Sequence, residues 1–289
     1  MSSDHPALGL SDLFSPAEKV CVVTGGGTGI GLMIAQGLAE NGAKRVYITG
    51  RRAERLKDAE KTYSKTPGQI VGIPCDITDQ ASLTNLAHQI STHHKIDLLI
   101  CNAGISAEDT TRTTAPSDPT NLPALSTWLQ SSSPSAWHST LTTNLTAQYF
   151  TIATLLPHLT PTASIITISS VSGIMKNNSM GQFAYAASKA GLIHLTRNLA
   201  WVLRETGVRV NGIAPGLFPS EMTERRPARE GTGKSELGKE RREWQAGRPG
   251  REEDVVAAVL WLAGRGGEFV TGQTVVVDGG LVTVRPSAM

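Results

Sequence analysis

Short apolar runs alternate with longer segments of helical periodicity along most of the chain. The run Val20–Val23 is too short and too rich in valine for a helix, whereas apolar residues then recur at Ile30, Ile34 and Leu38 with helical spacing. Further strands are predicted at residues 45–49, 69–74, 97–101, 163–169, 208–213 and 273–277, and further helices at 53–63, 79–94, 136–156, 185–205 and 252–263. Strands that alternate with helices predict βαβ units and a parallel sheet with right-handed crossovers.

Two segments break this alternation. Residues 106–135 are rich in Thr, Ser, Pro and Asp, and we expect a surface insertion near the mouth of the site, although a tolerated decoration fits equally well. Residues 215–250 form a long polar stretch that we interpret as a substrate-binding loop or lid, with a solvated loop as the alternative. This stretch holds Leu217, Phe218, Met222 and Trp244 among many charged residues.

Length and composition fit one large α/β domain. The chain has 289 residues, of which 39% are hydrophobic and 18% are charged, enough for a proper core without an interior linker. We place the domain at residues 17–289, after an N-terminal extension of residues 1–16 that shows no signal-peptide pattern. A net charge of +2 and the lack of a bilayer-spanning run favour neither nucleic-acid nor membrane partners.

Cysteine and histidine usage gives no sign of a disulfide framework or a metal centre. The three cysteines, Cys21, Cys75 and Cys101, each lie in or at the end of an apolar run, and none has CxxC spacing. Buried, reduced and inert thiols fit a cytoplasmic compartment. The seven histidines form no HExxH pattern, so no metal site is predicted.

A glycine cluster joins the first strand to the first helix, with the pattern Thr-Gly-x-x-x-Gly-x-Gly at residues 24–31. Gly25, Gly29 and Gly31 remove side chains that would block a pyrophosphate, and the helix start offers free N–H groups and the positive end of its dipole. This arrangement predicts a dinucleotide site, although a plain glycine-rich βα turn would show the same local pattern.

The end of the second strand bears on the choice of cofactor. An NAD site usually places an acidic residue there for the ribose 2′-hydroxyl, but this chain has Gly50 followed by Arg51 and Arg52. Arg51 can bind a 2′-phosphate bidentately and stack on adenine, with help from Arg52. We therefore predict NADP(H) as the cofactor; the alternative is that both arginines are solvated residues at a helix start.

Tyr185 and Lys189 lie four residues apart on a predicted helix and therefore share one face. A nearby ammonium lowers the pKa of a phenol from about 10 toward neutrality, as proton transfer requires, although surface Tyr/Lys pairs are also common. Ser170 follows a predicted strand at the end where doubly wound sheets bind ligands, and its hydroxyl can donate to a carbonyl oxygen. Its neighbours Ser169 and Ser172 carry the same group, and turn formation is their alternative role.

These elements occur together in an order and spacing that resemble the classical short-chain dehydrogenase/reductases. The matching elements are Thr24–Gly31, Asp76-Ile77, Asn102–Gly104, Asn144, Ser170, Tyr185 with Lys189, and Pro215-Gly216 followed by Ser220. The resemblance covers roughly residues 19–280, and the ending 269–280 is most similar to ketoacyl-reductase-like ketoreductases. It implies a single Rossmann-fold domain with a doubly wound, seven-stranded parallel sheet in the order 3-2-1-4-5-6-7 and helices on both faces.

The resemblance also implies roles for individual residues. Tyr185 would protonate the carbonyl oxygen, Lys189 would lower the Tyr185 pKa and hold the nicotinamide ribose, and Ser170 would bind the substrate oxygen. Asn144 would keep a relay water behind Lys189. The cofactor would contact Gly25, Thr28, Gly29, Ile30, Gly31, Arg51, Arg52, Asp76, Ile77, Asn102, Ala103, Gly104, Tyr185, Lys189, Pro215, Gly216 and Ser220. The substrate would contact Ser172, Leu217, Phe218 and Met222.

The implied function is the NADPH-dependent reduction of a small-molecule ketone to a secondary alcohol. The alternatives are a non-redox NADP-binding regulator or scaffold, which would typically have lost Tyr, Lys or Ser, and an imine reductase in natural-product tailoring. An enoyl reductase usually has a wider Tyr-to-Lys spacing than Tyr185 and Lys189 show. The resemblance further implies a homotetramer, with a dimer as the alternative, in which helices 136–156 and 185–205 pack across a two-fold axis.

Overall fold

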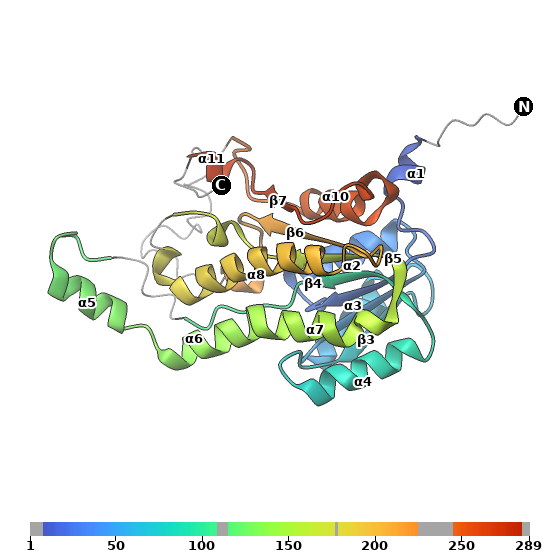
Figure 1. Ribbon diagram of the computed structural model, residues 1–289, viewed down its shortest axis with the longest axis horizontal. Helices are drawn as coiled ribbons and strands as arrows, with labels where there is room; N and C mark the ends of the chain where they lie inside the picture. Colours follow the sequence, from blue (N-terminus) through green and yellow to red (C-terminus); the bar gives the residue numbers. More distant parts are fainter. Residues whose placement is uncertain (1–7, 109–114, 177–178, 225–244, 285–289) are drawn as a thin grey trace, which may run out of the picture.

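The computed structural model describes residues 8–108, 115–176, 179–224 and 245–284, and its centre is a seven-stranded sheet (Figure 1). All strand pairs are parallel, and the order is β3-β2-β1-β4-β5-β6-β7, which confirms the predicted doubly wound topology. The strands are β1 (Val20–Thr24), β2 (Arg45–Gly50), β3 (Ile70–Pro74), β4 (Ile96–Cys101), β5 (Leu159–Ile168), β6 (Arg209–Pro215) and β7 (Thr274–Val277).

Helices cover both faces of this sheet. One face packs against α4 (Gln80–Ser91), α7 (Ala147–Leu155) and α8 (Phe183–Val202), and the other packs against α2 (Gly29–Glu40), α3 (Ala53–Tyr63) and α10 (Glu252–Ala263). Within β1, Val22 points to the first face while Cys21 and Val23 point to the second. Because both faces of the central strands are buried, their sequences read as continuous apolar runs.

The predicted helix at residues 136–156 is one helical rod of three parts rather than a uniform α-helix. It consists of α6 (Pro134–Leu141), a π-helical turn at Thr142–Thr146, and α7. A π-turn admits one extra residue without breaking the rod, and such turns are frequent at functional sites. Asn144 lies in the middle of this turn and is fully buried.

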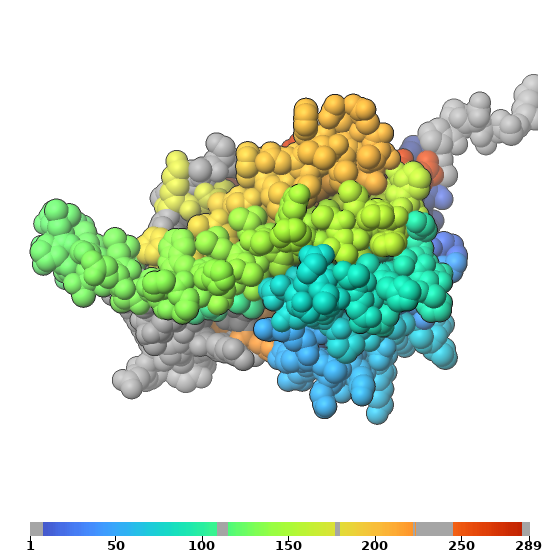
Figure 2. All heavy atoms as spheres, turned by 60° about the horizontal axis from the view of Figure 1, so that its bottom comes forward, coloured from blue at the N-terminus to red at the C-terminus, as the bar shows by residue number. Residues whose placement is uncertain are grey.

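The insertion at residues 106–135 contains a helix that the sequence analysis did not predict. Helix α5 (Leu122–Gln130) projects from one end of the molecule, as the green protrusion in Figure 2 shows. Leu122 and Leu129 are exposed, so the usual sign of a helix, an apolar stripe facing a core, is weak here. Asn121 caps α5 by accepting the N–H of Ala124.

Short helices complete the described part of the chain: α1 (Leu10–Phe14), α9 (Glu221–Glu224) and α11 (Leu281–Val284). Helix α1 lies within the predicted N-terminal extension, yet it packs against α10 and the 3-10 turn Arg265–Gly267. Among the described helices, none combines the length and the apolar character needed to cross a bilayer. In the same part of the chain, no cluster of three or more His, Cys, Asp and Glu side chains is suited to holding a metal ion.

Candidate active site

The predicted site residues gather at the carboxyl ends of the central strands. In the strand order 3-2-1-4-5, the chain winds outward in opposite directions from β1 and β4, so their ends form the switch point where such sheets bind ligands. Thr24 at the end of β1 holds these two strands together: its hydroxyl donates to Ile100 O (3.3 Å) and accepts the N–H of Asn102 (3.0 Å) and of Ala103 (3.1 Å). The sequence motif included Thr24 but gave no sign of this role.

The Asn102 side chain fixes the glycine turn. Its amide donates to Thr24 O (2.9 Å) and Gly25 O (3.3 Å). Gly25 has a φ of +65°, in the left-handed region that favours glycine. A Cβ added at Gly31 would collide with Gly25 O and with the Asn102 amide, so glycine is required there for packing as well as for access.

The start of α2 is open to an anion. Its N-cap residue, Thr28, makes no side-chain cap hydrogen bond, whereas Asp79 caps α4 by accepting the N–H of Ala81 and Ser82. The first backbone N–H groups of a helix need a partner, and a phosphate supplies one. The uncapped helix start and the glycine cradle therefore fit the pyrophosphate of a dinucleotide.

The two predicted phosphate-binding arginines differ in their surroundings. Arg51 is exposed and lies close enough to Asp76 for its charge to matter. Burial opposes ionisation of Asp76, but two hydrogen bonds from Thr78 and the charge of Arg51 outweigh it, so the pKa of Asp76 lies below its usual value. Arg51 thus lies near Asp76, another predicted cofactor residue, and is exposed to solvent.

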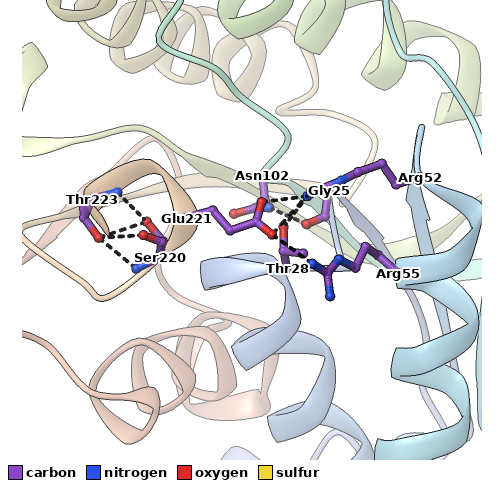
Figure 3. A network of polar contacts seen from close by, with 8 residues as sticks. All are labelled: Gly25, Thr28, Arg52, Arg55, Asn102, Ser220, Glu221 and Thr223. Atoms are coloured by element: carbon purple, nitrogen blue, oxygen red, sulfur yellow. Dashed lines mark hydrogen bonds and ion pairs between the residues drawn. The ribbon is translucent and has the colours of Figure 1, made fainter. Parts of the chain in front are cut away.

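Arg52 instead joins a network that reaches across to the start of the predicted lid (Figure 3). Its guanidinium donates to both carboxylate oxygens of Glu221, at 2.9 and 3.3 Å, and to the Thr28 hydroxyl at 3.1 Å. Arg55 adds an ion pair to Glu221 at 3.8 Å. Neither Glu221 nor Arg55 was predicted from the sequence, because their partners are distant in the chain.

Lys189 is almost completely buried at the end of β5. Its Nζ donates to Ile168 O at 2.9 Å and lies 5.7 Å from the centre of the Tyr185 ring, so the structure brings together the two residues that share a helix face. Loss of hydration on burial lowers the pKa of Lys189 from 10.5 to about 8. A Cβ at Gly104 would lie 3.4 Å from this Nζ, which places the loop after β4 beside it.

Asn144 makes hydrogen bonds to residues in two segments next to Lys189: Ile105 in the loop after β4, and Ser188 on α8. Its amide donates to Ile105 O (2.8 Å) and to the Ser188 hydroxyl (3.0 Å), and its Oδ1 accepts the N–H of Ile105 (2.8 Å). The side chain therefore joins the loop after β4 to α8, with both of its amide hydrogens engaged. The relay-water role stays a prediction.

The hydroxyl groups of Ser169 and Ser170 make different hydrogen bonds. The Ser169 hydroxyl donates to Ile213 O on β6 at 3.0 Å, which makes Ser169 part of the sheet edge. The Ser170 oxygen accepts the N–H of Ser172 at 3.1 Å, and no acceptor for its hydroxyl hydrogen lies among the described residues. The Ser169 hydroxyl is therefore engaged within the sheet, and the choice of Ser170 over Ser172 as the donor to a substrate oxygen stays a prediction.

The predicted lid residues occupy several environments. Ser220 lies against the glycine turn, with its Cβ 3.3 Å from the position of a Cβ on Gly29, and Gly216 N–H bonds to Val277 O at 2.9 Å. Phe218 is only 2% exposed and packs in the core against Gly250, and Leu217 packs beside Val171. Leu217 and Phe218 line a cavity of about 330 Å³ with residues 276–280, and no predicted catalytic residue lines this cavity. The side chain of Met222 and all of Trp244 lie outside the described residues.

Three further predicted cofactor residues pack mainly within the protein. Ile77 is 6% exposed and belongs to the core face formed with α4, and Ile30 packs on the opposite core face. Pro215 is the last residue of β6 and is buried. Contacts of these residues with a cofactor stay predictions.

A family model, curated relatives and solved structures all match this chain over most of its length. The family model described as enoyl-(acyl carrier protein) reductase matches residues 25–282. The short-chain dehydrogenase/reductase PhomF′ of Diaporthe leptostromiformis is 40% identical over 302 aligned positions that cover 99% of each chain. The rhamnolipids biosynthesis 3-oxoacyl-[acyl-carrier-protein] reductase of Pseudomonas aeruginosa is 37% identical over 279 positions, covering 92% of this chain and 97% of that protein. Among solved structures, the Pseudomonas aeruginosa RhlG/NADP active-site complex aligns with a TM-score of 0.76 and 34% identity, over 93% of this chain and 98% of that one.

Proposed function

Because the chain belongs to the short-chain dehydrogenase/reductase family, we propose that it is an NADP(H)-dependent ketoreductase that converts a small-molecule ketone into a secondary alcohol. The observation that carries the proposal is the buried Lys189 ammonium beside the Tyr185 ring, at the strand end that also bears Ser170. A phenol needs such a neighbour to act as an acid near neutral pH.

The site residues divide the work of carbonyl reduction. The Ser170 and Tyr185 hydroxyls hold the carbonyl oxygen, and Tyr185 gives its proton to that oxygen as the carbonyl carbon is reduced. Lys189 stabilises the resulting phenolate and binds the ribose hydroxyls. The cofactor, when bound, supplies the hydride. Asn144 and Ser188 keep the Lys189 helix and the loop after β4 in register.

Two features support NADP(H) over NAD(H). The residue at the end of β2 is Gly50, so no carboxylate repels a 2′-phosphate there, and the exposed Arg51 follows it. One similar solved structure is described as an NADP complex. The fit of the glycine turn and of the uncapped α2 to a pyrophosphate holds for either cofactor.

The substrate is proposed only as a ketone. Relatives named as 3-oxoacyl-[acyl-carrier-protein] reductases make 3-oxoacyl thioesters the first compounds to test. The four-residue spacing of Tyr185 and Lys189 argues against enoyl reduction, and an imine substrate remains the second candidate because the same acid can protonate nitrogen.

The test is oxidation of NADPH by the purified protein with a panel of 3-oxoacyl thioesters, cyclic ketones, cyclic imines and enoyl thioesters. We expect turnover with at least one ketone and none with the enoyl compounds. Binding of NADPH without turnover of any compound would instead favour a non-redox regulator or scaffold.

We also propose a cytoplasmic homotetramer. Helices α6, α7 and α8 extend across one face of the molecule (Figure 2), and Tyr149, Phe150 and Trp201 on α7 and α8 are 46%, 45% and 68% exposed. Phe269, just before β7, is fully exposed and suits a second interface. Light scattering should give four times the chain mass of 30.7 kDa, and a monomer at micromolar concentration would exclude the proposal.

A further inference from the structure

Helix α8 carries both Tyr185 and Lys189, yet it has no local N-terminal cap. Its N-cap residue, Gln182, makes no side-chain cap hydrogen bond within the described part of the chain, and its first turn contains no acidic residue. Helix starts usually satisfy their N–H groups with a Ser, Thr, Asp or Asn at the N-cap. The start of the catalytic helix therefore depends on a partner from elsewhere.

Glu108 is that partner. Its Oε2 accepts the backbone N–H of Tyr185 at 3.0 Å, across 77 residues of sequence. Tyr185 is the third residue of α8, and the N–H at this position is the one that an N-cap side chain commonly binds. Glu108 is only 4% exposed, and a carboxylate is rarely buried to this degree unless its oxygens are hydrogen-bonded.

The second carboxylate oxygen ties Glu108 into the insertion. Oε1 accepts the Ser132 hydroxyl at 3.3 Å, and the Ser132 oxygen in turn accepts the indole N–H of Trp137 at 3.0 Å. Ser132 lies between α5 and α6, while Trp137 is on α6. The carboxylate thus joins the insertion, α6 and the catalytic helix through consecutive hydrogen bonds.

Two further contacts hold the same parts together. The N–H of Ala107, next to Glu108, donates to the Thr140 hydroxyl on α6 at 3.2 Å. Trp128 on α5 packs edge to face against Phe183, the first residue of α8, with ring centres 5.5 Å apart. The insertion therefore contacts the beginning of α8 at its first and third residues.

We propose that Glu108 is a positioning residue that caps the catalytic helix from the insertion and thereby fixes the first turn of α8, where Tyr185 lies. The carboxylate satisfies a backbone donor and complements the positive end of the helix dipole. Because Lys189 is anchored separately through Ile168 O, loss of the cap frees the Tyr185 end of the helix more than the Lys189 end. This gives residues 106–135 a role in catalysis without contact with the reacting atoms. The kinetic part of the inference rests on the proposed ketoreductase function.

The test compares Glu108→Ala and Glu108→Gln with Asp79→Ala, which removes a carboxylate cap of the same kind from α4. Kinetics are measured at saturating NADPH with the best ketone of the panel. We expect Glu108→Ala to lower kcat by about 10- to 100-fold, as misplacement of a reacting group does, with the KM for NADPH unchanged. Glu108→Gln keeps an oxygen that can accept the Tyr185 N–H and should recover most of kcat. Asp79→Ala should lower Tm to a similar extent but leave kcat unchanged.

Hydrogen–deuterium exchange provides a readout that does not need turnover. Exchange in the peptide that covers Phe183–Lys189 should be faster in Glu108→Ala than in the wild type, and should be unchanged in Asp79→Ala. A normal kcat in Glu108→Ala, unchanged exchange in this peptide, or an equal loss of kcat in Asp79→Ala would overturn the inference. A wild-type protein that turns over none of the compounds refutes the proposed function instead, and the exchange measurement then decides the cap alone.

Discussion

The catalytic side and the phosphate side of the site are built in opposite ways. On the catalytic side, Asn144, Ser188 and Lys189 are buried, and each of their side chains makes hydrogen bonds of 3.0 Å or less within the protein. On the phosphate side, Arg52 and Glu221 keep 53% and 41% of their side chains exposed. Breaking a buried hydrogen bond costs about 1–3 kcal/mol, whereas an exposed ion pair contributes about 0–1 kcal/mol. On the proposed assignment, buried groups therefore position the chemistry, and exposed groups set the cofactor preference.

The largest effect is expected on the catalytic side, from Tyr185→Phe, which removes the proposed acid and keeps the ring. Turnover should fall by at least about 100- to 10,000-fold, the usual contribution of a positioned acid, while NADPH affinity stays nearly constant. Lys189→Ala should weaken both turnover and NADPH affinity. Steady-state kinetics and NADPH fluorescence titration measure the two effects. A Tyr185→Phe enzyme with most of its kcat would show that the acid lies elsewhere.

The next largest effect is expected from Arg51→Ala. A charge-assisted hydrogen bond is worth roughly 1.5–3 kcal/mol, so we expect the wild type to prefer NADPH over NADH on the order of 100-fold in kcat/KM. The variant should lose most of this preference through a higher KM for NADPH, with the KM for NADH almost unchanged. Equal use of both cofactors by the wild type would contradict the assignment, as would an unaltered preference in the variant.

The lowered pKa of Lys189 predicts that kcat/KM for NADPH depends on pH. Burial lowers its pKa to about 8, so its side chain is charged below that pH and neutral above it. As pH rises through about 8, the ammonium that binds the ribose is lost, and kcat/KM for NADPH should fall by up to about tenfold per pH unit. Lys189→Met should lack this step. A wild-type profile that is flat to pH 10 would indicate that Lys189 stays charged.

The smallest effect concerns Glu221→Gln. Loss of the carboxylate frees Arg52 and Arg55 for a 2′-phosphate, and an exposed pair of up to about 1 kcal/mol predicts at most a fivefold lower KM for NADPH. The KM for NADH should not change. The matched control is Glu205→Gln, which breaks an exposed pair with Arg204 at the end of α8. A higher KM for NADPH in Glu221→Gln would mean that Glu221 supports the bound cofactor rather than competing with it.

Burial of Lys189 also makes the stability of the folded protein depend on pH. A lysine with a lowered pKa binds its proton more weakly in the folded state than in the unfolded state, so its contribution to stability increases as pH rises from about 8 toward 10.5. Lys189 is therefore least favourable to folding at the pH where, on the proposed assignment, its charge is needed for catalysis.

The sequence predicted what depends on local pattern. Seven apolar runs became the seven strands, and the predicted helix at residues 79–94 corresponds to α4. The π-turn was missed because one extra residue hardly disturbs the apolar content of a helix. Glu108 and Glu221 were missed because their partners lie 77 and 169 residues away, and no local pattern marks either residue. Phe218 was predicted to contact substrate as an apolar residue in a polar segment, and its core packing against Gly250 depends on tertiary structure.

The π-turn at Thr142–Thr146 also separates the shape of the rod from the number of its residues. A π-turn holds one residue more than an α-helical turn, so deleting one residue within it would leave a continuous α-helix in which α6 and α7 keep their relative rotation. The contacts of Thr140 with Ala107 and of Trp137 with Ser132 would then persist. Asn144, in the middle of the turn, would lose the position from which its amide reaches Ile105 O and the Ser188 hydroxyl. The extra residue therefore serves the site and not the packing of the rod.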